Sequence, residues 1–192
     1  MNMATNSKMN LASPLRYACQ GVTLIEGMVV VAILGILAAI AVPGFKSTID
    51  GVRRTVYANQ LLEDLALARS EAIKRGVRVT VCPSIDASSC TDSTSWALGW
   101  IMFPDVAGTG VRDSATETLI RVHDALPDGW IAVKNGTRNY VGYSASGYNA
   151  DALGFTLAIC PASSACDTTT TTVPQTNLVM SSVGRVRIVS LN

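Results

Sequence analysis

The stretch Gly21-Val-Thr-Leu-Ile-Glu-Gly-Met-Val-Val-Val-Ala-Ile-Leu-Gly-Ile-Leu-Ala-Ala-Ile-Ala-Val-Pro43 decides the fold of this chain. It places one carboxylate, Glu26, at the edge of an otherwise uncharged segment of membrane-spanning length. A charge at the centre of a bilayer costs about 3 kcal/mol on insertion scales, so a carboxylate in such a segment indicates a function. A small residue, Gly21, precedes the segment, and this order predicts a processing site followed by a helix that must suit two environments.

The charged side chains before this segment are all positive. The leader 1–21 contains Lys8 and Arg16 but no Asp or Glu. Positive flanks stay in the cytoplasm, so the part after the apolar run is predicted to face the periplasm. A secretory signal carries its apolar run before the cleavage site and loses it, whereas cleavage after Gly21 would leave the run on the mature chain. An uncleaved signal anchor is the alternative, and Glu26 argues against it.

A second landmark is Pro43, which should kink the helix where the apolar run ends. Beyond it the pattern becomes amphipathic, and Gly76 is a plausible C-cap for one helix over about 22–75. Apolar residues recur at helical spacing: Phe45, Ile49, Val52, Val56, Leu61, Leu62, Leu65, Ala68 and Ala72. The chain therefore divides into a leader (1–21), an apolar half-helix (22–45), an amphipathic half-helix (46–75) and a periplasmic β-rich domain (76–192).

After Gly76 the pattern alternates between apolar and polar residues, which is typical of strands. The predicted strands are 77–81, 97–103, 118–122, 130–134, 139–144, 155–160, 178–182 and 185–189. Turn sequences separate them, including Asn135-Gly136, which predicts a hairpin turn, and Val183-Gly184. The expected class is α+β, with a long N-terminal helix packed on an antiparallel β domain of two small sheets.

Charge and cysteine content limit the function. Of the 192 residues, 15 are basic and 14 acidic, and loss of Lys8 and Arg16 with the leader would give the mature chain a net charge of −1. Such a domain is not a general polyanion binder, so any nucleic-acid affinity must come from a local cluster. Cys19 lies in the leader, and the other four cysteines allow three disulfide pairings. The spacing favours Cys82–Cys90 and Cys160–Cys166, each closing a short polar loop; a zinc site is the alternative, and its usual ligand spacings are absent.

The segment from Gly21 to Pro43 resembles the class III signal of type IV prepilins. The resemblance implies cleavage by a prepilin peptidase between Gly21 and Val22, N-methylation of Val22, and a helix stored in the inner membrane before it packs with other major and minor pilins. It also implies that Glu26 pairs with the N-terminal amine of a neighbouring subunit. Two features depart from the family: Val22 stands where Phe is usual, and the leader is long, so that Met9 is a second candidate start.

The order of motifs in the β domain resembles the branch that groups the minor pilins FimT and FimU with the pseudopilin GspH. It is carried by Trp96–Asp105, a late Cys160 and Gly184-Arg-Val-Arg187. This implies a pilin fold, a minor pilin that primes assembly of a type IV pilus, and a place at the cell surface after assembly. A GspH-like pseudopilin of a type II secretion system is the alternative.

Gly184, Arg185 and Arg187 match the Gly-Arg-x-Arg stretch of FimT-like pilins, which implies DNA binding during natural transformation. On a strand the two arginines would share one face about 6.6 Å apart, close to the spacing of successive phosphates. Lys134 and Arg138 extend this patch if they lie nearby. The alternative interpretation is an ordinary half-buried strand with two solvated arginines.

The sequence predicts neither an enzyme nor a cofactor site. Its one histidine, His123, lies beside Asp124, and no spacing supports a catalytic triad or a pair of catalytic carboxylates. Trp96 to Phe103 is interpreted as core packing, because tryptophan needs burial and a partner for its N–H.

Overall fold

The computed structural model describes residues 21–164, 166–169 and 172–191, without the side chains of Val42 and Pro43. The chain divides after Gly44 into two compact units, and each is described by itself. The leader, with Lys8, Arg16 and Cys19, lies outside the described residues apart from Gly21.

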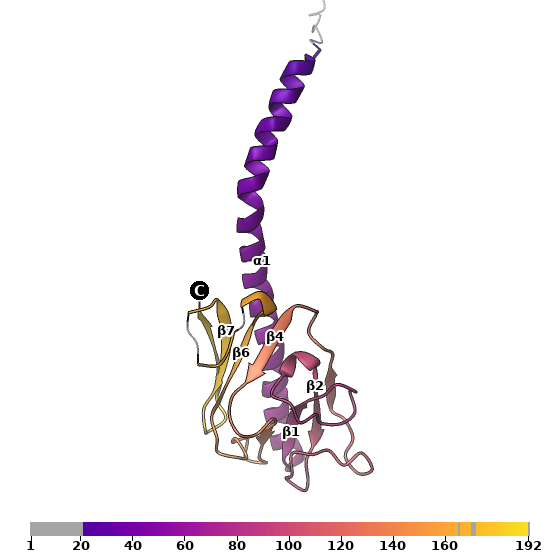
Figure 1. The fold of residues 1–192 in the computed structure, drawn as a ribbon. Helices are drawn as coiled ribbons and strands as arrows, with labels where there is room; N and C mark the ends of the chain where they lie inside the picture. The colour runs from indigo at the N-terminus through magenta and orange to yellow at the C-terminus, as the bar shows by residue number, and fades with distance from the viewer. Residues whose placement is uncertain (1–20, 165, 170–171, 192) are drawn as a thin grey trace, which may run out of the picture. The chain divides into compact units, whose positions relative to one another are not determined.

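One helix, α1, covers Leu24–Arg75 (Figure 1). Thr23 caps its start, because its hydroxyl accepts a hydrogen bond from the backbone N–H of Glu26 at 3.3 Å. This Thr-x-x-Glu signal is present in the sequence and was missed by the sequence analysis. At the other end Gly76 takes a φ of +67°, and its N–H bonds the carbonyl of Ala72 at 3.0 Å, as a C-cap should. The helical assignment passes through Pro43, and a kink there stays a prediction.

The first unit contains the apolar part of α1. Its best 18-residue window has a mean hydropathy of 2.6, so α1 is long and apolar enough to cross a membrane. The side chains described in this part are exposed, so their apolar surface is available to lipid or to other subunits.

In the second unit the later part of α1 packs on the β domain. The buried apolar face of the helix begins at Ala58 and not at Phe45, which is 67 % exposed. It consists of Ala58, Leu61, Leu65, Ala68 and Ala72. The earlier members of the predicted apolar face, including Ile49, Val52 and Val56, are exposed, so they do not belong to the core of the domain.

Two four-stranded antiparallel sheets form the rest of this unit (Figure 1). The first has the order β3-β2-β1-β5 and contains β1 (Val79–Pro83), β2 (Trp100–Pro104), β3 (Arg121–His123) and β5 (Val141–Tyr143). The second has the order β4-β6-β7-β8 and contains β4 (Trp130–Lys134), β6 (Phe155–Pro161), β7 (Gln175–Met180) and β8 (Val186–Leu191). Short 3-10 turns, η1 (Trp96–Leu98) and η2 (Ala162–Ser164), interrupt the loops. The predicted α+β class with two antiparallel sheets is confirmed.

Two details of the sequence prediction are wrong. Residues 97–103 do not form one strand, because the first of them belong to η1 and Gly99, with a φ of +94°, separates η1 from β2. Asn135-Gly136 is not a hairpin turn, because β4 pairs with β6 while β5 pairs with β1 in the other sheet. The turn residues there carry the chain from one sheet to the next.

A single core joins α1 to both sheets. It contains Leu61 and Leu65 of the helix, Val79 and Val81 of β1, and residues of β2, β6 and β7. Trp96 and Trp100 are almost fully buried, which confirms that their segment is core packing. Because every buried apolar side chain among the described residues lies at Ala58 or later, the second unit holds its own core.

Candidate nucleic-acid interface

The candidate DNA-binding residues lie at the β7–β8 hairpin. Arg185 closes the turn and Arg187 stands on β8 opposite Val179 of β7. The turn is tied by three hydrogen bonds: Gly184 N–H to the Ser181 carbonyl at 2.9 Å, Ser181 N–H to the Arg185 carbonyl at 2.9 Å, and Arg185 N–H to the Ser181 hydroxyl at 3.1 Å. The backbone beneath both arginines is therefore well defined.

Gly184 is required at this turn for two reasons. Its φ of +85° lies in the left-handed region, where a side chain is strained. A Cβ added here would also lie 2.9 Å from the backbone nitrogen of Asn149 and 3.2 Å from the ring of Tyr143. The hairpin thus packs closely on the loop that follows β5, and burial raises the pKa of Tyr143 to about 12.

Arg185 and Arg187 are exposed and face the same hollow. This hollow has a volume of about 360 Å³ and is lined by Val179, Ser181 and the two arginines. Among the residues that the structure describes, neither guanidinium has an ion pair or a hydrogen bond. The arrangement offers two free planar cations on one face, which suits phosphate oxygens.

Lys134 and Arg138 do not extend this patch. β4 and β8 are opposite edges of their sheet, so three strand spacings, roughly 14 Å, separate Lys134 from β8. Lys134 is buried, and its Nζ donates to the carbonyls of Asn135 and Arg138 at 3.0 and 2.5 Å. This burial lowers the pKa of Lys134 to about 8. Arg138 pairs with Asp151 at 3.2 Å.

A third arginine near the hairpin was missed by the sequence analysis. Arg69 of α1 and Arg185 line a second hollow of about 180 Å³ between the helix and the start of β8. In the sequence Arg69 is one of several charged residues on the helix, and no local signal separates it from the others. Only the packing of the hairpin against the helix brings it to this place.

The N-terminal residues of interest are exposed. Gly21 and Val22 precede α1, and Glu26 lies in its first turn. Cleavage, methylation and a pairing of Glu26 with a neighbouring amine stay predictions. The accessible position of Gly21 and Val22 is compatible with a peptidase.

All four cysteines of the β domain are in disulfides. Cys82 is joined to Cys90 and Cys160 to Cys166, which is the favoured pairing. The zinc alternative is therefore wrong for these cysteines, because their sulfurs are occupied. His123 stacks on Trp100 with 3.8 Å between ring centroids, and the described residues contain no group of three potential metal ligands.

Comparisons with known proteins agree with this architecture. The family described as "Type II transport protein GspH" matches residues 57–184, and a prokaryotic N-terminal methylation motif matches residues 16–42. Type IV major fimbrial protein FimA of Dichelobacter nodosus is 33 % identical over 106 residues, which are 55 % of this chain and 54 % of FimA. The chain thus spans about half the length of the curated relatives it matches.

The fold is also found in a solved structure. Type IV minor pilin FimU of Pseudomonas aeruginosa superposes with a TM-score of 0.55 at 19 % identity, covering 71 % of this chain and 88 % of FimU. The minor pseudopilin EpsH of Vibrio cholerae has a TM-score of 0.47 at 17 % identity, covering 71 % of this chain and 95 % of EpsH. The likeness to FimU confirms a pilin-type arrangement of helix and sheets.

Proposed function

This chain belongs to the GspH family, and from this premise we propose that it is a minor pilin of a type IV pilus that binds DNA weakly through Gly184, Arg185 and Arg187. Members of this family are structural subunits and not enzymes. The apolar helix and the methylation motif indicate a single pass through the inner membrane, with the C-terminal domain outside and assembly into a pilus. The observation that carries the DNA-binding proposal is the pair of arginines on one face of the β7–β8 hairpin, neither of which has an ion pair among the described residues.

The proposed maturation is cleavage between Gly21 and Val22 by a prepilin peptidase, followed by methylation of the new amine. Mass spectrometry of the chain isolated from cells tests this step. We expect an N-terminal peptide that begins at Val22 and carries one added methyl group. A Gly21→Leu variant should remain uncleaved, and an N-terminus at residue 1 or 9 in the wild-type filament would contradict the proposal.

Glu26 is proposed to act in assembly. A carboxylate in a dry interface needs a cation, and the N-terminal amine of Val22 in a neighbouring subunit is one. We expect Glu26→Gln to insert in the membrane normally but to be absent from sheared filaments. The opposite result, normal incorporation, would remove Glu26 from the assembly mechanism.

DNA binding is proposed to be weak and independent of sequence. Two phosphate contacts predict a slope of roughly −1.8 for log K against log salt on duplex DNA, and a dissociation constant on the order of 10 µM or weaker. Fluorescence anisotropy should show binding that Arg185→Ala/Arg187→Ala abolishes. The matched control is Lys46→Ala/Arg53→Ala, which removes the same charge from an exposed part of α1. A folded wild-type protein that does not bind DNA would leave assembly as the whole function.

The second candidate is a pseudopilin of a type II secretion system. The description of the matching family favours it. Isolation of each filament type from the native cell distinguishes the two, because the minor pilin should be recovered with the pilus and the pseudopilin with the secretion apparatus.

A further inference from the structure

We propose that the DNA path continues from the hairpin into the groove between α1 and β8, where Arg69 contacts a third phosphate and Tyr148 offers a stacking surface, so that the site takes single-stranded DNA. The proposal rests on the proposed function, because it uses the same hairpin arginines. It adds a chemical class of ligand and two residues that the Gly-Arg-x-Arg stretch does not contain.

Arg69 of α1 is a half-buried cation. Among the described residues it has no ion pair and no hydrogen bond, although it lines the groove with Tyr143 and Arg185. Three other arginines of this unit are neutralised: Arg75 pairs with Glu71 at 2.6 Å, Arg78 with Asp105 at 3.2 Å, and Arg121 with Asp64 at 2.5 Å. A partly desolvated cation without a carboxylate is a place where an anion is stabilising.

The position of Arg69 is held by the surrounding loop. A Cβ added to Gly147 would lie 3.3 Å from Nε of Arg69 and 2.7 Å from Cδ1 of Ile73, so this loop packs directly on the helix. The same loop lies against the hairpin, because a Cβ on Gly184 would be 3.4 Å from the carbonyl carbon of Tyr148. The helix, the loop and the hairpin therefore form one surface.

Arg185 connects the two hollows. It lines the hollow that contains Arg187 and also the one that contains Arg69, so the two hollows are neighbours and share one arginine. A flexible backbone of phosphates can pass from one hollow to the other. No described carboxylate lines either hollow to oppose it.

The shape and chemistry of the path favour a single strand. The groove has a volume of about 180 Å³, and Arg69 lies in its wall. A single strand is narrow enough to enter such a groove and reach this guanidinium, whereas a duplex is too wide to enter it. Tyr148 is 57 % exposed, and its backbone lies against Gly184, which lines this groove. Proteins that bind single strands combine a cationic groove with exposed aromatic rings on which bases stack.

The experiment uses the full chain in micelles of a non-ionic detergent. Anisotropy titrations compare a labelled single-stranded oligonucleotide with its duplex of equal length, across a salt series. We expect tighter binding of the single strand. Arg69→Gln should weaken single-strand binding about fivefold at 0.1 M salt and reduce the salt slope by about 0.7, the values for one released counterion. Arg69→Lys should retain most of the affinity for the single strand and most of the salt slope.

Two matched controls accompany these variants. Arg53→Gln makes the same change on the same helix, 16 residues away and therefore roughly 24 Å along its axis, and should bind as the wild type. Tyr148→Leu should weaken single-strand binding about fivefold or more while duplex binding is unchanged, and Tyr148→Phe should bind normally. Circular dichroism and thermal melting check that each variant is folded.

The outcomes separate this inference from the proposed function. If Arg185→Ala/Arg187→Ala abolishes binding but Arg69→Gln or Tyr148→Leu leaves it unchanged, or if duplex binds as well as single strand, this inference is overturned and the proposed function stands. If the folded wild-type chain binds neither oligonucleotide, both are overturned.

Discussion

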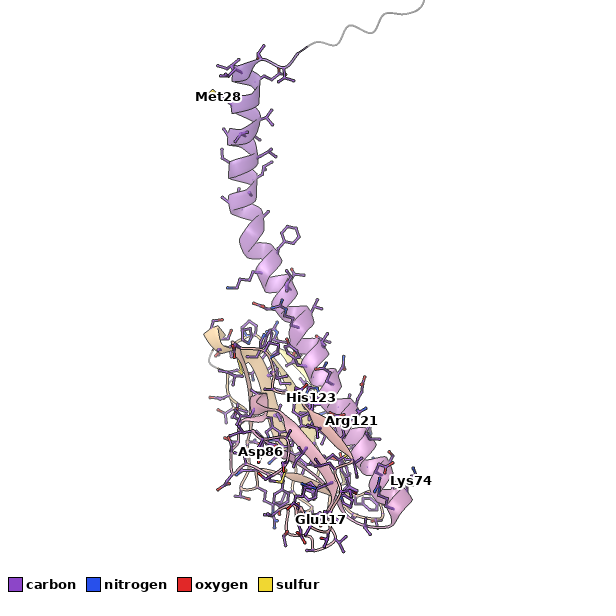
Figure 2. All side chains as sticks on the ribbon, turned by 90° about the vertical axis from the view of Figure 1, so that its right-hand side faces the viewer. Met28, Lys74, Asp86, Glu117, Arg121 and His123 are labelled. Carbon is purple, nitrogen blue, oxygen red and sulfur yellow. A yellow bond between two sulfur atoms is a disulfide. The ribbon has the colours of Figure 1, made fainter. Side chains whose placement is uncertain are left out.

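The carboxylate of Asp64 on α1 accepts a hydrogen bond from Nε1 of Trp100 on β2, with 2.8 Å between the two atoms. Asp64 is 2 % exposed and also pairs with Arg121 of β3 at 2.5 Å. This pairing raises the pKa of Arg121. In Figure 2 the labelled Arg121 lies beside α1, with which it pairs through Asp64. One buried carboxylate therefore links the helix to two strands of the first sheet.

We expect Asp64→Leu to lower the free energy of unfolding by about 2–3 kcal/mol, because it leaves the buried indole N–H of Trp100 without an acceptor. Arg121 is 49 % exposed and can turn to water, so its loss adds little. Asp64→Asn should be milder, because an amide oxygen still accepts from the indole. Urea unfolding of the unit that begins at Phe45 measures the difference. Glu63→Leu, at an exposed neighbouring carboxylate, is the control, and equal effects of both leucine variants would contradict the prediction.

Gly184→Ala should be more destabilising than Gly129→Ala. The two glycines have φ values of +85° and +86°, so alanine is strained by about 1 kcal/mol at either one. At Gly129 the new methyl group meets nothing within 4 Å, whereas at Gly184 it meets the backbone nitrogen of Asn149 at 2.9 Å. The resulting overpacking should add about 1–3 kcal/mol at Gly184. Thermal melting of both variants checks this. Equal melting temperatures would show that the loop containing Asn149 moves to accommodate the methyl group without loss of stability.

Each disulfide should stabilise the domain by about 2–3 kcal/mol, since both close short loops. We expect Cys82→Ser/Cys90→Ser and Cys160→Ser/Cys166→Ser each to lower the melting temperature. A reducing agent should lower it in the wild type, while a metal chelator should leave it unchanged. A shift caused by the chelator would indicate that a metal contributes to stability.

Lys134 should make stability depend on pH above neutrality. Its pKa is about 8 in the folded protein and about 10.5 when unperturbed, so between these values the unfolded chain binds more protons. The free energy of unfolding contributed by this residue should therefore rise as pH increases from about 8 to 10.5 and be constant below that window. Chemical denaturation of the wild type and Lys134→Met across this range isolates the effect. Parallel curves for the two proteins would rule it out.

The ends of α1 were predictable because they depend on local chemistry. Gly76 stops the helix at Arg75 as expected, and the predicted start at residue 22 differs from Leu24 by only two residues because Thr23 serves as the cap. The strand at 130–134 also agrees with β4, since its apolar run is bounded by clear turn signals. Such features are set by neighbouring residues and need no knowledge of the partner strand.

The partners of the strands were not predictable in the same way. Asn135-Gly136 is typical of a tight hairpin, yet the chain crosses there to the other sheet because β4 pairs with β6 beyond it. The position of Lys134 in its strand is typical of an exposed residue. The ring of Phe155 nevertheless covers its ammonium group, with 4.9 Å between Nζ and the ring centroid. The role of Arg69 likewise depends on a hairpin more than 100 residues later in the sequence. These outcomes come from long-range packing, which no local pattern contains.

The strand order determines when the β domain can complete its fold during export. β8 is the last strand in the described chain, and it supplies both Arg187 and the inward-facing Val186 and Ile188 that cover the core. During export β8 emerges after the other described strands, so the second sheet cannot close before β8 itself has been translocated. A partly exported subunit without β8 would therefore have neither a finished core nor the arginine of that strand.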